Sequence, residues 1–127
     1  MAKVLGVGGI FFKSPDPVKL YQWYSRWLGL DVDLESGKTF VVFQPGTMPK
    51  SGYTVWSPFE ATTNYFAPSD RAFMFNLVVD NLAEALQQVT TGGAQVVGEI
   101  EQTEYGRFGW FLDPDGNKVE LWEPPSA

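Results

Sequence analysis

The chain repeats one order of secondary structure, and this repeat constrains its fold more than any other feature. Each half predicts the order β-α-β-β-β, and the two halves are offset by roughly 65 residues. The helix-start acids Asp16 and Asp80 and the helix-end glycines Gly29 and Gly93 keep this offset to within a residue. We therefore expect a single α+β domain over residues 1–127, with module 1 at about 1–67 and module 2 at about 70–127.

Local patterns predict the elements of module 1. Asp16 as N-cap and Pro17 at the first helical position start a helix that Gly29 ends. Runs rich in β-branched and aromatic residues predict strands on both sides of this helix. The expected strands are 4–13, 30–34, 39–44 and 53–56, with a turn at 35–38 and a polar, proline-punctuated loop at 57–71.

Module 2 repeats the pattern. Asp80 and Asn81 are expected to cap a helix over 82–89 that Gly92 and Gly93 end. The expected strands are 72–79, 94–102, 107–112 and 117–122. In each module the helix covers one face of a mixed sheet. The two uncovered faces are therefore expected to curl toward each other as a cup-shaped half-barrel with the helices outside.

Composition excludes several classes of function. The 127 residues include no histidine and no cysteine, which removes Ser-His-Asp catalysis, thiol chemistry and disulfides. The net charge of −6 argues against a nucleic-acid or anionic-membrane surface. No apolar run approaches the roughly 20 residues that cross a bilayer, and the N-terminus lacks a signal-peptide core, so we expect a cytoplasmic protein.

One carboxylate stands out in the segment FLDPDGNKVELW. The DPDG turn separates two strand-like runs, and Glu120 lies in the second run between Val119 and Leu121. Burying a lone carboxylate is costly unless it is paired, hydrogen-bonded or bound to a metal. Strand alternation puts Glu120 on one face with Lys118 and Trp122. Glu120 therefore faces either water or a cavity that uses its charge.

Three segments together resemble the vicinal oxygen chelate superfamily, which includes glyoxalase I, bleomycin-resistance proteins and extradiol dioxygenases. They read GGIFFKSPDPVKLYQWYSRWLGL, NLVVDNLAEALQQVTTGGAQV and YGRFGWFLDPDGNKVELWEPP, and they span essentially the whole chain. The resemblance implies a cup with four metal ligands at its floor and a homodimer. Of the ligand positions, those in the first strands of the modules fall on Gly9 and Met74, and only Glu120 carries a usual ligand. We therefore expect no metal and no other cofactor.

The resemblance also implies a cavity that Glu120 lines as the candidate catalytic residue. Aromatic side chains from the strands and the central loop are expected to line it as an apolar pocket for a flat ligand. Arg107 is the candidate for binding a ligand anion or for neutralising Glu120. The full set of expected ligand-binding residues is Phe43, Trp56, Tyr65, Phe75, Arg107, Phe111 and Trp122.

Three functions fit these features. The first, which we prefer, is a protein like the bleomycin-resistance branch that binds a small apolar or aromatic molecule without a metal. The second is a small-molecule lyase or isomerase like the glyoxalase branch, with Glu120 as general base and Arg107 or Tyr105 as oxyanion stabiliser. The third is a dimeric interaction module without a small ligand. The expected partners are a small molecule and a second copy of the chain, with no nucleic acid and no membrane.

Overall fold

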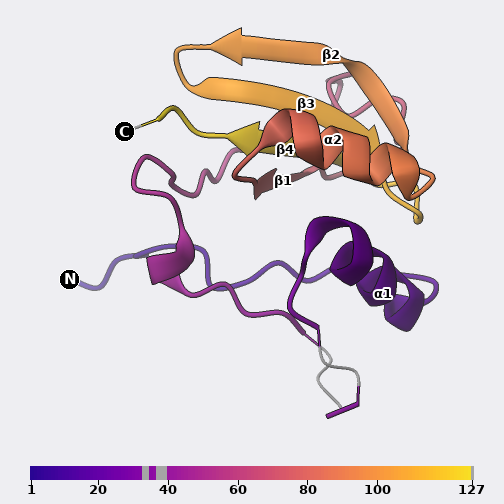
Figure 1. Cartoon of the computed structure of the whole chain (residues 1–127). Coiled ribbons are helices and arrows are strands. Elements are labelled where there is room, and N and C mark those ends of the chain that lie inside the picture. The colour runs from indigo at the N-terminus through magenta and orange to yellow at the C-terminus, as the bar shows by residue number, and fades with distance from the viewer. Residues whose placement is uncertain (33–34, 37–39, 127) are drawn as a thin grey trace.

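In the described residues the fold is α+β, with two α-helices, one short 3-10 helix and a curled, unclosed sheet of four strands (Figure 1). The computed structural model describes residues 1–32, 35–36 and 40–126. The elements in chain order are α1 (Pro17–Leu28), the short 3-10 helix η1 (Pro45–Thr47), β1 (Phe75–Val78), α2 (Leu82–Thr91), β2 (Gln95–Thr103), β3 (Gly106–Leu112) and β4 (Lys118–Glu123). The predicted α+β class is confirmed, while the division into two modules stays a prediction.

The sheet has the strand order β1-β4-β3-β2. β1 pairs in parallel with β4, whereas β4 with β3 and β3 with β2 are antiparallel. The DPDG turn joins β3 to β4 as the sequence predicts. Asp113 accepts hydrogen bonds from the backbone N–H groups of Asp115 and Asn117, and Gly116 adopts the left-handed conformation with φ 83°.

Local signals set the ends of both helices. The side chain of Asp16 accepts a hydrogen bond from the backbone N–H of Lys19 at 3.2 Å, and Gly29 ends α1 with φ 68°. For α2 the cap is Asn81, whose side chain accepts from the N–H of Glu84 at 3.0 Å. The expectation that Asp80 caps this helix is therefore wrong by one residue.

The hydrophobic core lies between the helices and one face of the sheet. α2 packs on the sheet, and α1 packs against α2 (Figure 1). The buried core side chains are Leu20, Tyr24, Leu82, Ala85, Val89, Phe111, Val119 and Leu121. Trp23 ties α1 to α2 by donating its indole N–H to the carbonyl of Gly92 at 2.9 Å. Within the described residues, neither helix is long and apolar enough to cross a membrane.

The strands expected in module 1 are not formed in its described part. Residues 4–13, 40–44 and 53–56 contain no strand, although their composition favours one. Residues 33–34 and 37–39, which belong to the expected strands 30–34 and 39–44 and to the expected turn 35–38, lie outside the described residues. β-Propensity alone does not make a strand, because the backbone groups need a neighbouring strand to pair with.

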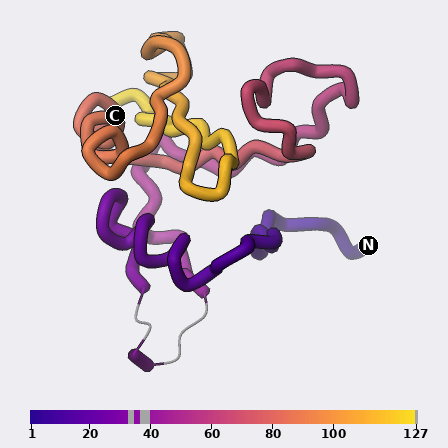
Figure 2. The backbone as a smooth tube through the Cα atoms, turned by 90° about the vertical axis from the view of Figure 1, so that its right-hand side faces the viewer, coloured from indigo at the N-terminus to yellow at the C-terminus, as the bar shows by residue number. Residues whose placement is uncertain are grey.

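Many apolar side chains of these segments stay exposed as a result. Figure 2 shows the N-terminal segment running away from α1 as an extended tube. The exposed apolar side chains are Val4, Leu5, Val7, Ile10, Phe11, Phe12, Phe40, Val42, Phe43, Tyr53, Val55 and Trp56.

Candidate functional site

The sheet has one face under the helices and one without a helix, and β4 alternates between them. Val119 and Leu121 are fully buried in the core beneath the helices. Lys118, Glu120 and Trp122 therefore point to the opposite side. We call this side the open face; by the strand register it consists of Asn76, Val78, Phe108, Trp110, Leu112, Lys118, Glu120 and Trp122.

Glu120 lies at the centre of the open face and accepts three hydrogen bonds. Its Oε2 accepts from the Tyr65 hydroxyl at 2.6 Å and from the Trp110 indole N–H at 2.8 Å. Its Oε1 accepts from the side-chain amide of Asn76 at 2.7 Å. Trp110 and Asn76 are the register partners of Glu120 on β3 and β1, whereas Tyr65 reaches it from the loop 57–71. Three uncharged donors thus stabilise one half-buried carboxylate.

Lys118 holds the same loop at a second point. Its Nζ donates to the backbone carbonyl of Tyr65 at 2.6 Å. The ammonium lies 5.0 Å from the ring centroid of Tyr65 and 5.7 Å from that of Trp110, within the range of cation–π attraction. Burial lowers the pKa of Lys118, and the neighbouring charge of Glu120 acts in the opposite direction. The loop 57–71 is therefore fastened to the sheet through both the hydroxyl and the backbone of Tyr65.

Aromatic rings surround this polar centre. Tyr65 stacks on Phe59 at 5.7 Å and meets Trp110 edge-on at 6.4 Å between ring centroids. Burial raises the pKa of Tyr65, and its hydrogen bond to Glu120 and the charge of Glu120 add to that rise. The phenol therefore keeps its proton at neutral pH and remains a hydrogen-bond donor.

A second aromatic group continues the open face toward the end of β4. Trp122 stacks on Phe108 with an interplanar angle of 5° and meets Tyr53 edge-on at 4.9 Å. Its indole N–H donates to the carbonyl of Tyr105 at 2.7 Å. These contacts bury the Trp122 ring to 4% exposure and leave Phe108 and Tyr53 as the more exposed rings of this group.

Some of the expected site residues gather on the open face. Glu120 and Trp122 lie there, and Tyr65 covers it from the loop. Phe43 and Trp56 belong to segments without strands and are 69% and 80% exposed. Among the described residues, no ring contact joins either of them to Tyr65, Trp110 or Trp122.

The structure places three other expected residues on the helix side. Phe111 is 0% exposed in the core, with its ring 5.8 Å from that of Trp23. Phe75 is the register partner of the core residue Val119. Arg107 lies beside Glu123, at 3.9 Å between side-chain nitrogen and oxygen, so it is not the partner of Glu120. In each case strand alternation sets the side, because the neighbours Asn76, Phe108 and Trp110 occupy the open face.

The sequence analysis missed the residues that hold Glu120 and Tyr65. These are Asn76, Trp110 and Lys118. Lys118 carried a signal, since it is two residues from Glu120 on the same strand face. Asn76 and Trp110 could have been found only from the pairing of β4 with its two neighbours, which the sequence does not state.

The donor set does not fit the four-ligand metal site that the resemblance implies. Both oxygens of Glu120 already accept hydrogen bonds from neutral donors. Within residues 1–32, 35–36 and 40–126, no three His, Cys, Asp or Glu side chains come together at one metal position. A hard divalent cation binds carboxylate oxygens in preference to amide, indole and phenol groups. The side chains that contact Glu120 are of these weaker kinds. What this arrangement offers instead is an aromatic surface with one charged acceptor.

Tyrosine ionisation is expected to make the fold sensitive to alkali. Burial and the neighbouring Asp113 raise the pKa of Tyr24, and burial and Glu120 raise that of Tyr65. Both raised values stabilise the fold below the unfolded-state pKa of about 10, and this stabilisation is lost as the pH rises above it. In denaturant unfolding between about pH 9 and about pH 11, the Tyr65→Phe variant should lose less stability than the parent. Equal losses in the parent, Tyr65→Phe and Tyr24→Phe would contradict this expectation.

The comparisons with known proteins point to one family. Residues 9–122 match the family described as the Glyoxalase-like domain. No curated protein is significantly similar to the chain.

Several solved structures are similar as well. TnmS3, an antibiotic binding protein from a Streptomyces species, is 22% identical with a TM-score of 0.51, over 88% of this chain and 89% of that chain. A protein of unknown function from Agrobacterium tumefaciens is 24% identical with a TM-score of 0.54, over 94% and 98%. A glyoxalase/bleomycin resistance protein/dioxygenase superfamily member from Sphaerobacter thermophilus is 34% identical over 39% of this chain and 40% of that chain, with a TM-score of 0.35.

Proposed function

The chain belongs to the glyoxalase-like domain family, and from this premise we propose that it binds a small apolar or aromatic molecule on the open face without a metal. The observation that carries the proposal is the setting of Glu120. Its carboxylate is held in place by Tyr65, Trp110 and Asn76 among aromatic rings. A mostly apolar surface with a few fixed polar groups is what a small-molecule site requires.

The arrangement also suggests which ligands would fit. The Tyr65 ring is 38% exposed and can meet a flat molecule directly. Trp110 and Trp122 are 7% and 4% exposed, so they would back the site behind Tyr65 and Tyr53. Glu120 accepts two hydrogen bonds on Oε2 and one on Oε1, which leaves room on Oε1 for one more. A flat ligand with one N–H or O–H donor would use both features. TnmS3, which has the same fold, is an antibiotic binding protein.

Binding is better supported than catalysis by Glu120. A general base must offer a lone pair to a substrate proton. Most of the lone pairs of Glu120 already accept hydrogen bonds. Of the two expected oxyanion stabilisers, Arg107 and Tyr105, Arg107 lies on the other side of the sheet beside Glu123. The lyase or isomerase function therefore has less support than a binding function.

A binding screen tests the proposal. Flat aromatic compounds, with and without an N–H or O–H donor, would be titrated against the protein while its tryptophan fluorescence is recorded. We expect micromolar binding of some donor-bearing compounds, and weaker binding of the same compounds to Trp110→Phe. If no compound binds while the protein is folded, the function as an interaction module without a small ligand replaces this proposal.

We expect the purified protein to hold no stoichiometric divalent metal. The reason is the donor set, in which Glu120 has neutral neighbours and the positions of Gly9 and Met74 lack strong ligands. Elemental analysis of protein purified without chelators measures this directly. One equivalent of zinc, nickel, iron or manganese would contradict the expectation and favour the lyase or isomerase function.

We also propose that the chain acts as a cytoplasmic homodimer. The support is the exposed apolar surface of module 1, where Phe11 is 95% exposed and Val55 is 67% exposed. Exposed apolar side chains in such number are typical of protein interfaces. Light scattering at micromolar concentration should therefore give about twice the chain mass of 14.2 kDa. A mass of one chain at that concentration would rule out the dimer.

A further inference from the structure

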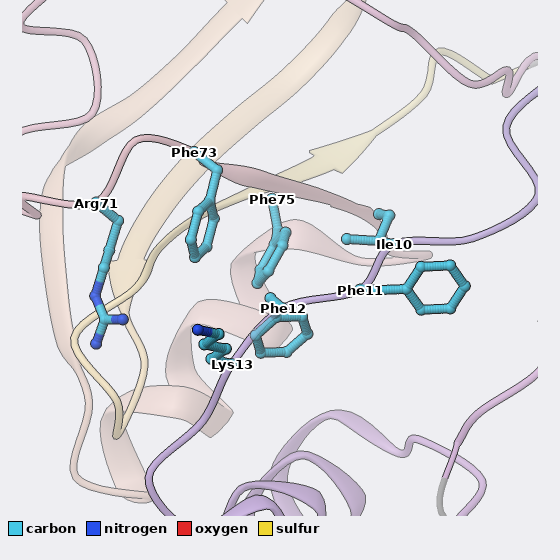
Figure 3. A pocket seen from close by; sticks show the side chains of 7 residues that line it. All are labelled: Ile10, Phe11, Phe12, Lys13, Arg71, Phe73 and Phe75. Carbon is cyan, nitrogen blue, oxygen red and sulfur yellow. The ribbon is translucent and has the colours of Figure 1, made fainter.

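A cavity lies beside β1, on the other side of the sheet from Glu120. Its volume is about 370 Å³, and it is lined by Ile10, Phe11, Phe12, Lys13, Arg71, Phe73 and Phe75 (Figure 3). We call it the edge cavity. Phe75 lines it, whereas the next residue, Asn76, points to the open face and donates to Glu120. Strand alternation therefore separates the two sites.

Three phenyl rings form the wall of the edge cavity. The ring centroids of Phe12 and Phe75 are 4.6 Å apart, those of Phe73 and Phe75 are 5.0 Å apart, and those of Phe12 and Phe73 are 6.3 Å apart. The rings come from two segments that are distant in sequence, so the wall exists only in the folded chain. Mutual contact of this kind holds aromatic rings in defined positions against which an apolar ligand can pack.

The cavity is apolar at one end and cationic at the other. Figure 3 shows Ile10 and Phe11 on one side of the three rings and the charged ends of Arg71 and Lys13 on the other. Neither cation forms an ion pair with a carboxylate of the described residues. This is notable in a chain whose net charge is −6.

Arg71 is held in position by a hydrogen bond that leaves other N–H donors of its guanidinium available. Its Nη2 donates to the backbone carbonyl of Asp115 at 2.8 Å, which anchors the half-buried guanidinium. A guanidinium has five N–H donors in a fixed plane, so several remain for a ligand. Guanidinium groups bind carboxylates through two parallel hydrogen bonds. Lys13 adds a second, exposed positive charge at the same end.

We propose that the edge cavity binds a small amphipathic carboxylate, with its hydrocarbon part on the three phenyl rings and its carboxylate on Arg71 and Lys13. The volume lies at the lower end of the range of about 300–1,000 Å³ for small-molecule pockets, which suits an aryl-substituted short-chain acid. This site is independent of the binding function proposed for the open face.

Phenylbutyrate and its uncharged amide are matched probes for this proposal. Both carry the same hydrocarbon, and only the acid can pair with the two cations. Backbone amide signals of nitrogen-labelled protein would be followed by NMR during each titration. We expect the acid to shift the signals of residues 10–13 and 71–75 and to bind at least about tenfold more tightly than the amide.

Charge-removing variants assign the effect to the cavity. Arg71→Gln should weaken binding of the acid by about tenfold and leave the amide unchanged. Lys19→Gln, an exposed α1 lysine outside the cavity lining, is the matched control and should bind the acid like the parent. If Arg71→Gln fails to fold, Lys13→Gln at the exposed position gives the same comparison with a smaller loss.

Three results would overturn the proposal. The first is equal affinity for the acid and the amide. The second is a set of signal changes confined to the open face around Trp110. The third is no binding of the acid while the protein is folded, whether it is a monomer or a dimer.

Discussion

Replacing Phe111 with alanine is expected to lower the free energy of unfolding by about 3–5 kcal/mol, the usual cost of removing a buried phenyl ring. Phe111 is 0% exposed and contacts the α1 residue Trp23 across the core. The loss of the ring leaves a cavity between the helices and the sheet. Denaturant unfolding of parent and variant, with the slope of the transition compared, measures the change.

Phe108→Ala is the matched control for this change. Phe108 lies three residues away on the same strand but on the open face, where it stacks on Trp122 and is only half-buried. Its removal should cost clearly less stability than the removal of Phe111. The Phe111→Ala protein could instead be as stable as the parent and bind ligand more weakly. That result would contradict the core position of Phe111 and support its predicted role in ligand binding.

Replacing Glu120 with leucine is expected to destabilise the fold by about 3 kcal/mol, because three donors lose their acceptor at once. The hydroxyl of Tyr65, the indole of Trp110 and the amide of Asn76 all depend on this carboxylate. Partial exposure lets water replace some of these bonds, so the cost stays below the sum of three fully buried losses. The loop 57–71 should also be held less firmly on the sheet, because Tyr65 loses its hydrogen bond to Glu120. Limited proteolysis should therefore cut that loop faster than in the parent.

Glu120→Gln separates the charge from the hydrogen bonds. The glutamine oxygen can accept from Tyr65 and Trp110, and its amide can donate to Asn76 after the Asn76 amide turns over. We expect Glu120→Gln to stay within about 1 kcal/mol of the parent stability while its affinity for donor-bearing ligands falls by at least about tenfold. Glu120→Leu as stable as the parent would show that Glu120 is a solvated strand residue.

Module 2 could be predicted from sequence because its signals are local. Asn81 caps α2, Gly116 takes the left-handed turn position, and the apolar face of α2 meets the sheet at helical spacing. Alternation along β4 also put Glu120, Lys118 and Trp122 on one face, as the structure shows. Each of these predictions depends only on residues that are close together in the sequence.

What the sequence could not supply was pairing over long distances. The strands expected at 4–13 and 53–56 depended on partners, and β-rich composition does not name a partner. The sequence predicts the strand that carries Arg107 and Phe111, but it does not show on which face of the sheet each side chain lies. Adjacent strand residues point to opposite sides, so an error of one position moves a side chain from the ligand site into the core.

The sequence predicts Tyr65 as a site residue but does not predict its hydrogen-bond partner. Its aromatic character and its place in the central loop made it a candidate for the site. Its hydroxyl contact with Glu120 joins residues 55 positions apart, and only the folded chain brings them together.

Tryptophan indole signals report directly on whether the open face around Glu120 binds a small molecule. The chain has five tryptophans, of which Trp110 donates to Glu120 and Trp122 donates to Tyr105. In protein labelled on the indole nitrogens, a compound from the binding screen should shift the signals of Trp110 and Trp122 by NMR. The signal of Trp23, which lies on α1 and packs against the core, should stay nearly unchanged. Binding that leaves the Trp110 signal in place would contradict the account and locate the ligand elsewhere on the molecule.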